Sequence, residues 1–149
     1  SVFFSGDTGL TNEYEAIRDR LGPFDLVMLE VGAFHPSWGD IHLGPANALA
    51  AHEMLGGGVL MPVHWGTFAL STHAWDEPVE SLLSLAGPRR AHLLLAHLGE
   101  AVGPVERRPV TPWWRSGDDR IDRKHAVEPD PVETSEADRL AGSVPWPLD

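Results

Sequence analysis

Apolar runs and amphipathic segments alternate over the first part of the chain. The apolar runs predict four strands, at residues 1–5, 24–31, 59–64 and 91–96. The first is expected to be buried, and the second is apolar enough for a central strand. Apolar residues at helical spacing between the runs predict three helices, at residues 12–21, 45–55 and 76–85. This order is typical of an α/β fold with helices packed on a sheet.

Polar and turn-forming residues mark where the predicted elements begin and end. Asn12 and Glu15 have the spacing of a capping box at the start of the first helix. Gly22 and Gly87, each followed by proline, are expected to end the first and third helices. Residues 99–102 predict a last, short hairpin strand.

The alternating pattern ends near residue 110. We therefore predict one domain at residues 1–110, followed at residues 111–149 by an acidic, proline-rich tail that is extended or disordered. Trp113, Trp114 and Trp146 could pin parts of this tail.

Composition narrows the kinds of function. The net charge of −11 argues against a nucleic-acid surface, because phosphate binding needs clustered Lys and Arg. The chain has no cysteine, so any metal must be held by histidine and carboxylate. The 149 residues contain no signal-peptide pattern. They also contain no apolar run near the roughly 20 residues that a membrane span needs. They predict a cytoplasmic protein without a transmembrane segment.

Two predicted strands end at residues that can bind a metal. Asp7 lies in the Gly-Asp-Thr-Gly turn after the first strand, and His64 follows the third strand. Because α/β proteins present ligands at the carboxyl ends of strands, we expect both side chains to belong to one site. Each also has a simpler interpretation, since Asp7 could cap its own turn and His64 could be satisfied by backbone hydrogen bonds.

His42 is a third candidate. It lies in the long loop at residues 32–44, directly before the second helix, and loops of this length are often functional. It could act as a general acid, donate a hydrogen bond to a transition state or orient a substrate. Alternatively, it is an exposed loop residue. His52, on the second predicted helix, is expected to face partly outward.

Several short blocks, taken in order, resemble the metallo-β-lactamase superfamily. They are Phe4-Ser5-Gly6-Asp7-Thr8-Gly9, Gly22-Pro23-Phe24-Asp25-Leu26, Val31-Gly32-Ala33-Phe34, His42 and His64-Trp65-Gly66-Thr67-Phe68. Within the superfamily, the blocks are most similar to the branch that contains N-acyl-phosphatidylethanolamine phospholipase D and the ascorbate-6-phosphate lactonase-like hydrolases. The similarity extends over roughly residues 2–110.

The resemblance implies an αββα sandwich that binds one or two metal ions. The metal is usually zinc, and other divalent metals are also possible. It implies that Asp7 bridges the metals, that His64 is the last histidine ligand, and that His42 contacts the substrate or reacting group. The implied activity is that of a metal-dependent hydrolase. A metal-activated water would attack a phosphodiester, a cyclic phosphate or a lactone in a small-molecule or lipid-like substrate.

The resemblance is incomplete in one respect. The main ligand motif of the superfamily, His-x-His-x-Asp-His, does not occur in these 149 residues. We therefore expect residues 1–110 to form the C-terminal half of the sandwich, with further zinc ligands outside this chain. The missing N-terminal half, another chain or a second copy would be its partner. Alternatively, the chain is a non-catalytic half-sandwich interaction module, or a flavodoxin-like binding domain, which the lack of a phosphate loop disfavours.

Overall fold

A parallel sheet is the frame of the protein. The computed structural model describes residues 1–69, 71–89 and 91–116, and residues Ser1–Ser116 form one compact unit. The strands are β1 Val2–Phe4, β2 Leu26–Glu30, β3 Val59–Val63 and β4 His92–Leu93. Neighbouring strands are parallel, in the order β1-β2-β3-β4. The α/β class predicted from the alternating pattern is confirmed.

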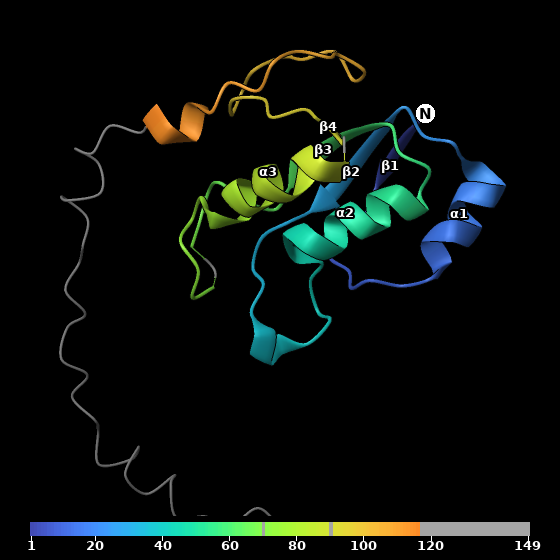
Figure 1. Cartoon of the computed structure of the whole chain (residues 1–149), viewed down its shortest axis with the longest axis horizontal. Coiled ribbons are helices and arrows are strands. Elements are labelled where there is room, and N and C mark those ends of the chain that lie inside the picture. Colours follow the sequence, from blue (N-terminus) through green and yellow to red (C-terminus); the bar gives the residue numbers. More distant parts are fainter. Residues whose placement is uncertain (70, 90, 117–149) are drawn as a thin grey trace, which may run out of the picture. The chain divides into compact units, whose positions relative to one another are not determined.

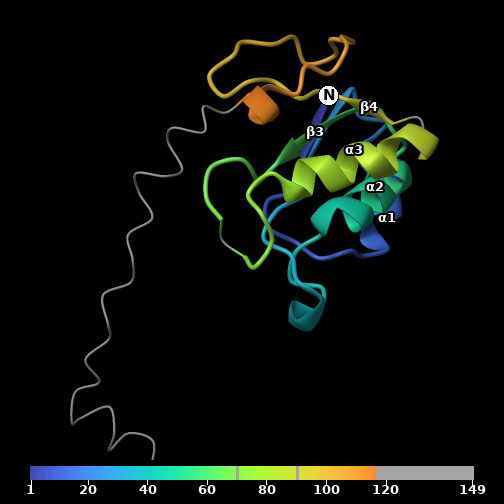
Figure 2. The ribbon, with the colours of Figure 1, turned by 60° about the vertical axis from the view of Figure 1, so that its left-hand side comes forward.

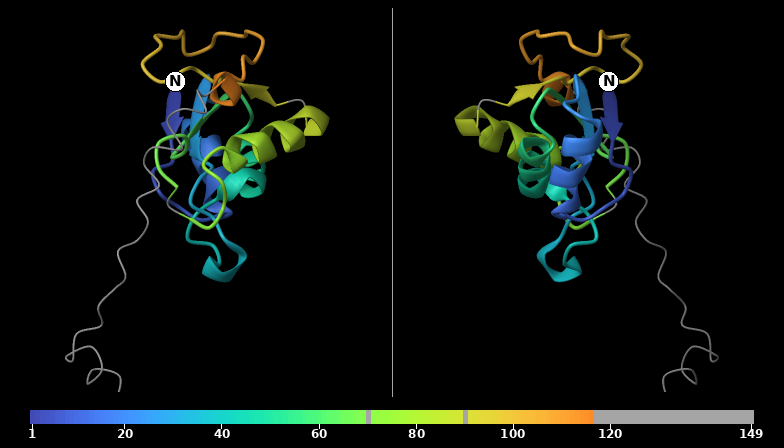
Figure 3. Two further views of the ribbon diagram at one scale, coloured as in Figure 1. Left: turned by 90° about the vertical axis from the view of Figure 1, so that its left-hand side faces the viewer. Right: turned by 90° about the vertical axis from the view of Figure 1, so that its right-hand side faces the viewer.

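Three helices connect the strands and pack on one face of the sheet (Figures 1 and 2). They are α1 Glu13–Leu21, α2 Gly44–Met54 and α3 Glu77–Arg89. An edge view shows α2 and α3 on the same side of the strands (Figure 3). Right-handed crossovers between parallel strands in sequential order produce this one-sided arrangement. Two short 3₁₀ helices, η1 Pro36–Trp38 and η2 Trp113–Ser116, complete the described elements.

Alternation along the strands divides their side chains between the two faces of the sheet. The helical face carries the main core, in which strand residues pack with residues from every helix: Val27, Leu29 and Leu60 with Tyr14, Leu49 and Leu82. On the opposite face, Leu26 and Val59 pack with Leu94, and Met28 and Met61 are partly buried against them. The two cores fix the sheet, so the ends of its strands are rigid attachment points.

β1 differs from the buried strand that the sequence predicted. It lies at the edge of the sheet, and only Phe3 packs into the core on the helical face. Val2 and Phe4, on the opposite face, are 57% and 63% exposed. The prediction was wrong because a short apolar run looks the same whether one face of its strand is covered or both. β2, by contrast, is central and buried, as predicted.

Several element ends and one predicted strand also differ from the prediction. Asn12 has helical dihedral angles, φ −70° and ψ −12°, and its side chain makes no capping hydrogen bond. α3 continues through Pro88 to Arg89, past the end predicted at Leu85. Residues 99–102 form no strand in the described part of the chain, and β4 is shorter than predicted.

Three further predictions concern a membrane span, the cellular location and the tail. Among the described residues, no helix is both long and apolar enough to cross a bilayer. The cytoplasmic location stays a prediction. Most of the predicted tail, residues 117–149, lies outside the described residues, and so does Trp146.

Candidate metal centre

The carboxyl ends of three strands bring polar side chains together at one edge of the sheet. Asp7 follows β1, Glu30 is the last residue of β2, and His64 comes directly after β3. His42 reaches the same place from the loop between β2 and α2. One potential ligand atom from each of these four residues lies within 4.8 Å of the others. The structure thus brings together all three residues that the sequence singled out, and adds Glu30.

Asp7 and His64 are placed to share an ion. His64 Nε2 lies 3.8 Å from Asp7 Oδ1. Zinc bonds to nitrogen and oxygen of about 2.0–2.2 Å allow two donors of one ion to lie up to about 4 Å apart, so this separation fits. The side chains are 67% and 28% exposed, respectively, so both can reach an ion at the surface of this unit. They supply two donors, whereas a closed zinc site takes four.

Glu30 occupies the centre of the cluster and is fully buried. Its Oε1 accepts hydrogen bonds from the backbone N–H of Thr8 at 2.7 Å and of Leu43 at 3.3 Å. Its Oε2 accepts from His42 Nδ1 at 2.5 Å and lies 3.7 Å from His64 Nδ1. The carboxylate therefore accepts hydrogen bonds from two separate segments and lies close to His64 of a third, which is how a buried charge is tolerated.

His42 is held between Glu30 and His64. His42 Nδ1 is 2.5 Å from Glu30 Oε2, and a carboxylate in the ionised form would require the proton of this hydrogen bond to be on Nδ1. The ring stacks on that of His64, with centroids 5.1 Å apart and planes 26° from parallel. The side chain is 16% exposed. Its Nε2 is the ring nitrogen that Glu30 does not contact.

Two glycines let the site segments approach each other closely. A Cβ on Gly32 would lie 1.9 Å from the carbonyl oxygen of His64, and one on Gly9 would lie 2.0 Å from that of Asp40. His64 itself has a φ of 62°, which non-glycine residues adopt rarely. Its backbone is thus forced into a sparsely populated conformation, and such strain is common at functional positions.

An aromatic cluster fixes the backbone beyond β3. Trp65 stacks on Trp113 with ring centroids 5.6 Å apart and meets Trp114 edge-on at 5.5 Å. Trp114 Nε1 donates to Glu80 on α3 at 2.7 Å, and Arg115 donates to both carboxylate oxygens of Glu80. Hydrogen bonds from Arg115 and Trp114 lower the pKa of Glu80 to about 2. Trp65, the residue after His64, is therefore anchored by η2.

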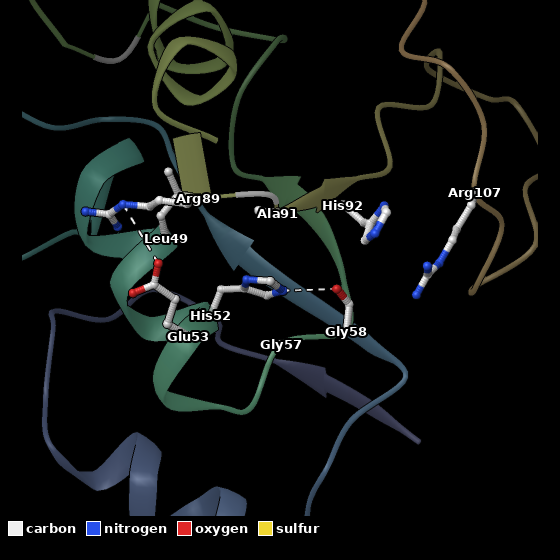
Figure 4. A pocket seen from close by; sticks show the side chains of 9 residues that line it. All are labelled: Leu49, His52, Glu53, Gly57, Gly58, Arg89, Ala91, His92 and Arg107. Carbon is white, nitrogen blue, oxygen red and sulfur yellow. Dashed lines mark hydrogen bonds and ion pairs between the residues drawn. The ribbon is translucent and has the colours of Figure 1, made fainter. Parts of the chain in front are cut away.

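His52 is not placed as the sequence predicted. It is 5% exposed, at the opposite end of the sheet from the metal centre, and its Nε2 donates to Gly58 O at 3.1 Å (Figure 4). Burial lowers the pKa of His52, and the bond to Gly58 partly opposes this. Arg89 and Arg107 line the same cavity. The sequence pattern did not show that His52 faces inward, because its hydrogen-bond acceptor, Gly58 O, lies in the glycine turn after α2.

Sequence reasoning missed Glu30. The only local signal is a carboxylate as the last residue of an otherwise apolar central strand, in the sequence Leu-Val-Met-Leu-Glu. An acid at that position is expensive to bury unless it is paired, so it points to partners contributed by distant segments.

Comparisons with known proteins match this region. A family model described as a beta-lactamase superfamily domain matches residues 1–65, which contain all four residues of the cluster. An uncharacterized protein of Mycobacterium tuberculosis is 44% identical over 117 residues, which cover 76% of this chain and 32% of that protein. The N-acyl-phosphatidylethanolamine-hydrolyzing phospholipase D 1 of Caenorhabditis elegans is 34% identical over 91 residues, 58% of this chain and 26% of that protein.

A solved structure is similar in fold. It is that of Igni18, a novel metallo hydrolase from the hyperthermophilic archaeon Ignicoccus hospitalis, with a TM-score of 0.51 and 26% sequence identity. The match covers 68% of this chain and 39% of that one. The chain also spans only about a third, or less, of the length of the curated relatives described above.

Proposed function

Because the chain belongs to the metallo-β-lactamase superfamily, we propose that it supplies part of the active site of a metal-dependent hydrolase. The observation that carries this proposal is the separation of 3.8 Å between Asp7 Oδ1 and His64 Nε2. The two residues come from turns after different strands, and both lie at the edge of the sheet where α/β proteins bind ligands.

Asp7 and His64 are proposed as ligands of one or two zinc ions. Carboxylate and imidazole donors suit zinc, although other divalent metals accept the same set. When bound, the metal would lower the pKa of a water molecule and polarise the scissile bond, so that hydrolysis proceeds near neutral pH. Asp7, as a carboxylate with two oxygens, is suited to bridge two ions.

Further ligands are proposed to come from the missing half of an αββα sandwich or from another chain. The exposure of Val2 and Phe4 on the face of the sheet away from the helices supports this, because a second layer would bury them. The greater length of the relatives is also consistent with a half-domain at residues 1–110.

His42 is proposed to act on the substrate rather than on the metal. Its Nδ1 is bound to Glu30, so only Nε2 is available to the reacting group, from which it can accept a hydrogen bond or a proton while the ring is neutral. Its stacking on the His64 ring keeps that nitrogen beside the proposed ligands.

The proposed substrate is a phosphodiester, a cyclic phosphate or a lactone, carried by a small or lipid-like molecule. An apolar side chain that could contact such a substrate lies beside the proposed metal centre. Phe68 is 73% exposed and lines a surface hollow together with His64 and Trp65. The name of the Caenorhabditis elegans relative, an enzyme that hydrolyses a phospholipid, supports the phosphodiester over the lactone.

A non-catalytic interaction module is the alternative. The observation that favours it is that Asp7 and His64 provide only two outward donors in the described part of the chain. A half-sandwich of this kind would bind its partner through the exposed face of the sheet and hold no metal.

Elemental analysis of the complete protein, combined with assays on a phosphodiester and on a lactone, tests the proposal. We expect one or two zinc ions per chain, and hydrolysis of at least one substrate that a chelator abolishes and added zinc restores. A complete protein that contains no metal and hydrolyses neither substrate would instead establish the interaction module.

A further inference from the structure

Glu30 touches every segment that contributes to the metal centre. It accepts hydrogen bonds from the N–H of Thr8, which follows Asp7, and from the N–H of Leu43, which follows His42. One carboxylate therefore links the two loops that carry these side chains to the end of β2. This arrangement is more than is needed to satisfy a buried acid, since it reaches the nearest neighbours of two site residues.

The same carboxylate faces the Nδ1 atoms of both site histidines. Its Oε2 is 2.5 Å from Nδ1 of His42 and 3.7 Å from Nδ1 of His64. A histidine that donates from Nδ1 presents an unprotonated Nε2, and the partner of one ring nitrogen decides which tautomer is present. His64 Nε2 is also the nitrogen nearest Asp7. Both rings thus turn the same atom towards Glu30.

Glu30 is unsuited to be a ligand itself. A carboxylate has about four acceptor positions, and three of those of Glu30 are used by Thr8, Leu43 and His42. Its side chain has no exposed surface, whereas that of Asp7 is 67% exposed. An ion coordinated by Glu30 would have to displace hydrogen bonds that hold the loops in place.

We propose that Glu30 is a positioning residue, which holds the proton of His42 on Nδ1, so that Nε2 of His42 faces the reaction, and which lies beside Nδ1 of His64 as a charged neighbour. This inference rests on the proposed function, because it assigns the tautomer of His42 that the proposed substrate contact requires. Carboxylate partners of metal-bound histidines orient the ring and increase its basicity, and their loss typically lowers metal affinity about 10–100-fold.

The direct test is the tautomer of His42 in the complete protein labelled with ¹⁵N-histidine. Long-range ¹H–¹⁵N NMR spectra distinguish a ring protonated on Nδ1 from one protonated on Nε2. We expect the proton on Nδ1 of His42, with and without zinc. A proton on Nε2 in the unsubstituted protein would overturn the proposal, and this result does not depend on any variant folding.

The variant Glu30→Gln extends the test. Its amide oxygen can still accept from the backbone N–H groups, but its NH₂ group would donate to His42 and move the ring proton to Nε2. We expect that change in the spectrum, about 10–100-fold weaker zinc binding by chelator competition, and a fall in kcat. Glu15→Gln, on the exposed surface of α1, is the matched control and should leave all three unchanged.

The two proposals fail in different ways. If the unsubstituted protein binds no zinc, the hydrolase proposal fails, while the histidine spectrum still decides the role of Glu30. If the protein binds zinc and hydrolyses substrate, but a folded Glu30→Gln variant keeps the original tautomer and zinc affinity, then Glu30 has only a structural role.

Discussion

The carbonyl oxygen of His64 lies directly against the α-carbon of Gly32, where a Cβ atom would be 1.9 Å away. Gly32 follows β2 closely and His64 follows β3, so this contact sets the spacing between the two segments at the metal centre. It also explains why a side chain is absent at position 32, although the backbone there does not require positive φ.

Substituting Gly32 by alanine should therefore displace His64. We expect a loss of about 1–3 kcal/mol in the free energy of unfolding, as for overpacked sites. We also expect zinc binding at least about 10-fold weaker, because the proposed ligand His64 would be displaced. Gly87→Ala is the control, since it lies in α3 and a Cβ added there would meet no other segment within 4 Å. Equal unfolding curves and zinc affinities for the two variants would contradict the prediction.

Asp7 and His64 should behave differently from His42 on substitution. In the complete protein, Asp7→Asn or His64→Ala should lose most of the bound metal and nearly all hydrolysis. His42→Ala should retain the metal and lose rate by about 10²–10⁴-fold, the range typical of general acid–base groups. Metal content by elemental analysis, measured beside kcat, separates these outcomes. Loss of metal from His42→Ala would make that residue a ligand instead.

Trp114 should stabilise the fold and, through Trp65, the metal centre. It is 3% exposed, and truncation of such a side chain to alanine typically costs about 3–5 kcal/mol. Trp38→Ala is the control, because Trp38 is 39% exposed in η1 and surface changes usually stay within about 0.5 kcal/mol. Urea unfolding of both variants measures the difference. Similar losses for the two would show that the aromatic cluster is not a stabilising contact.

The buried His52 predicts a dependence of stability on pH. Its folded-state pKa lies below the ordinary value of 6.5, so the unfolded chain takes up the proton first as the pH falls. The contribution of His52 is therefore fully present above the unfolded-state pKa and is lost on acidification below it. His52→Gln, whose amide can still donate to Gly58, should flatten the change in unfolding free energy between pH 7.5 and 5.5.

That pH window separates His52 from the acidic groups. The pKa of Glu80 is lowered to about 2 from 4.5, so its contribution is lost only at more acidic pH. A His52→Gln variant that shows the same slope as the unsubstituted protein between pH 7.5 and 5.5 would rule out His52 as the source.

The sequence was most informative where chemistry and strand ends coincide. Asp7 and His64 could be paired in advance, because parallel strands in an α/β fold finish at a common edge. Glu30 could not, because its hydrogen-bond partners Thr8 and Leu43 are 22 and 13 residues away in the chain. The exposure of Val2 was likewise hidden, since an apolar run does not show which face of its strand is covered.

β1 leaves one side of its backbone unpaired in the described part of the chain, next to the exposed side chains of Val2 and Phe4. A bare strand edge with apolar neighbours is a template for strand addition by another molecule. Because this edge is open, we expect residues 1–116 on their own to associate along β1 at high concentration. A second layer that covers Val2 and Phe4 would therefore keep the protein soluble, apart from any ligand that it adds to the site.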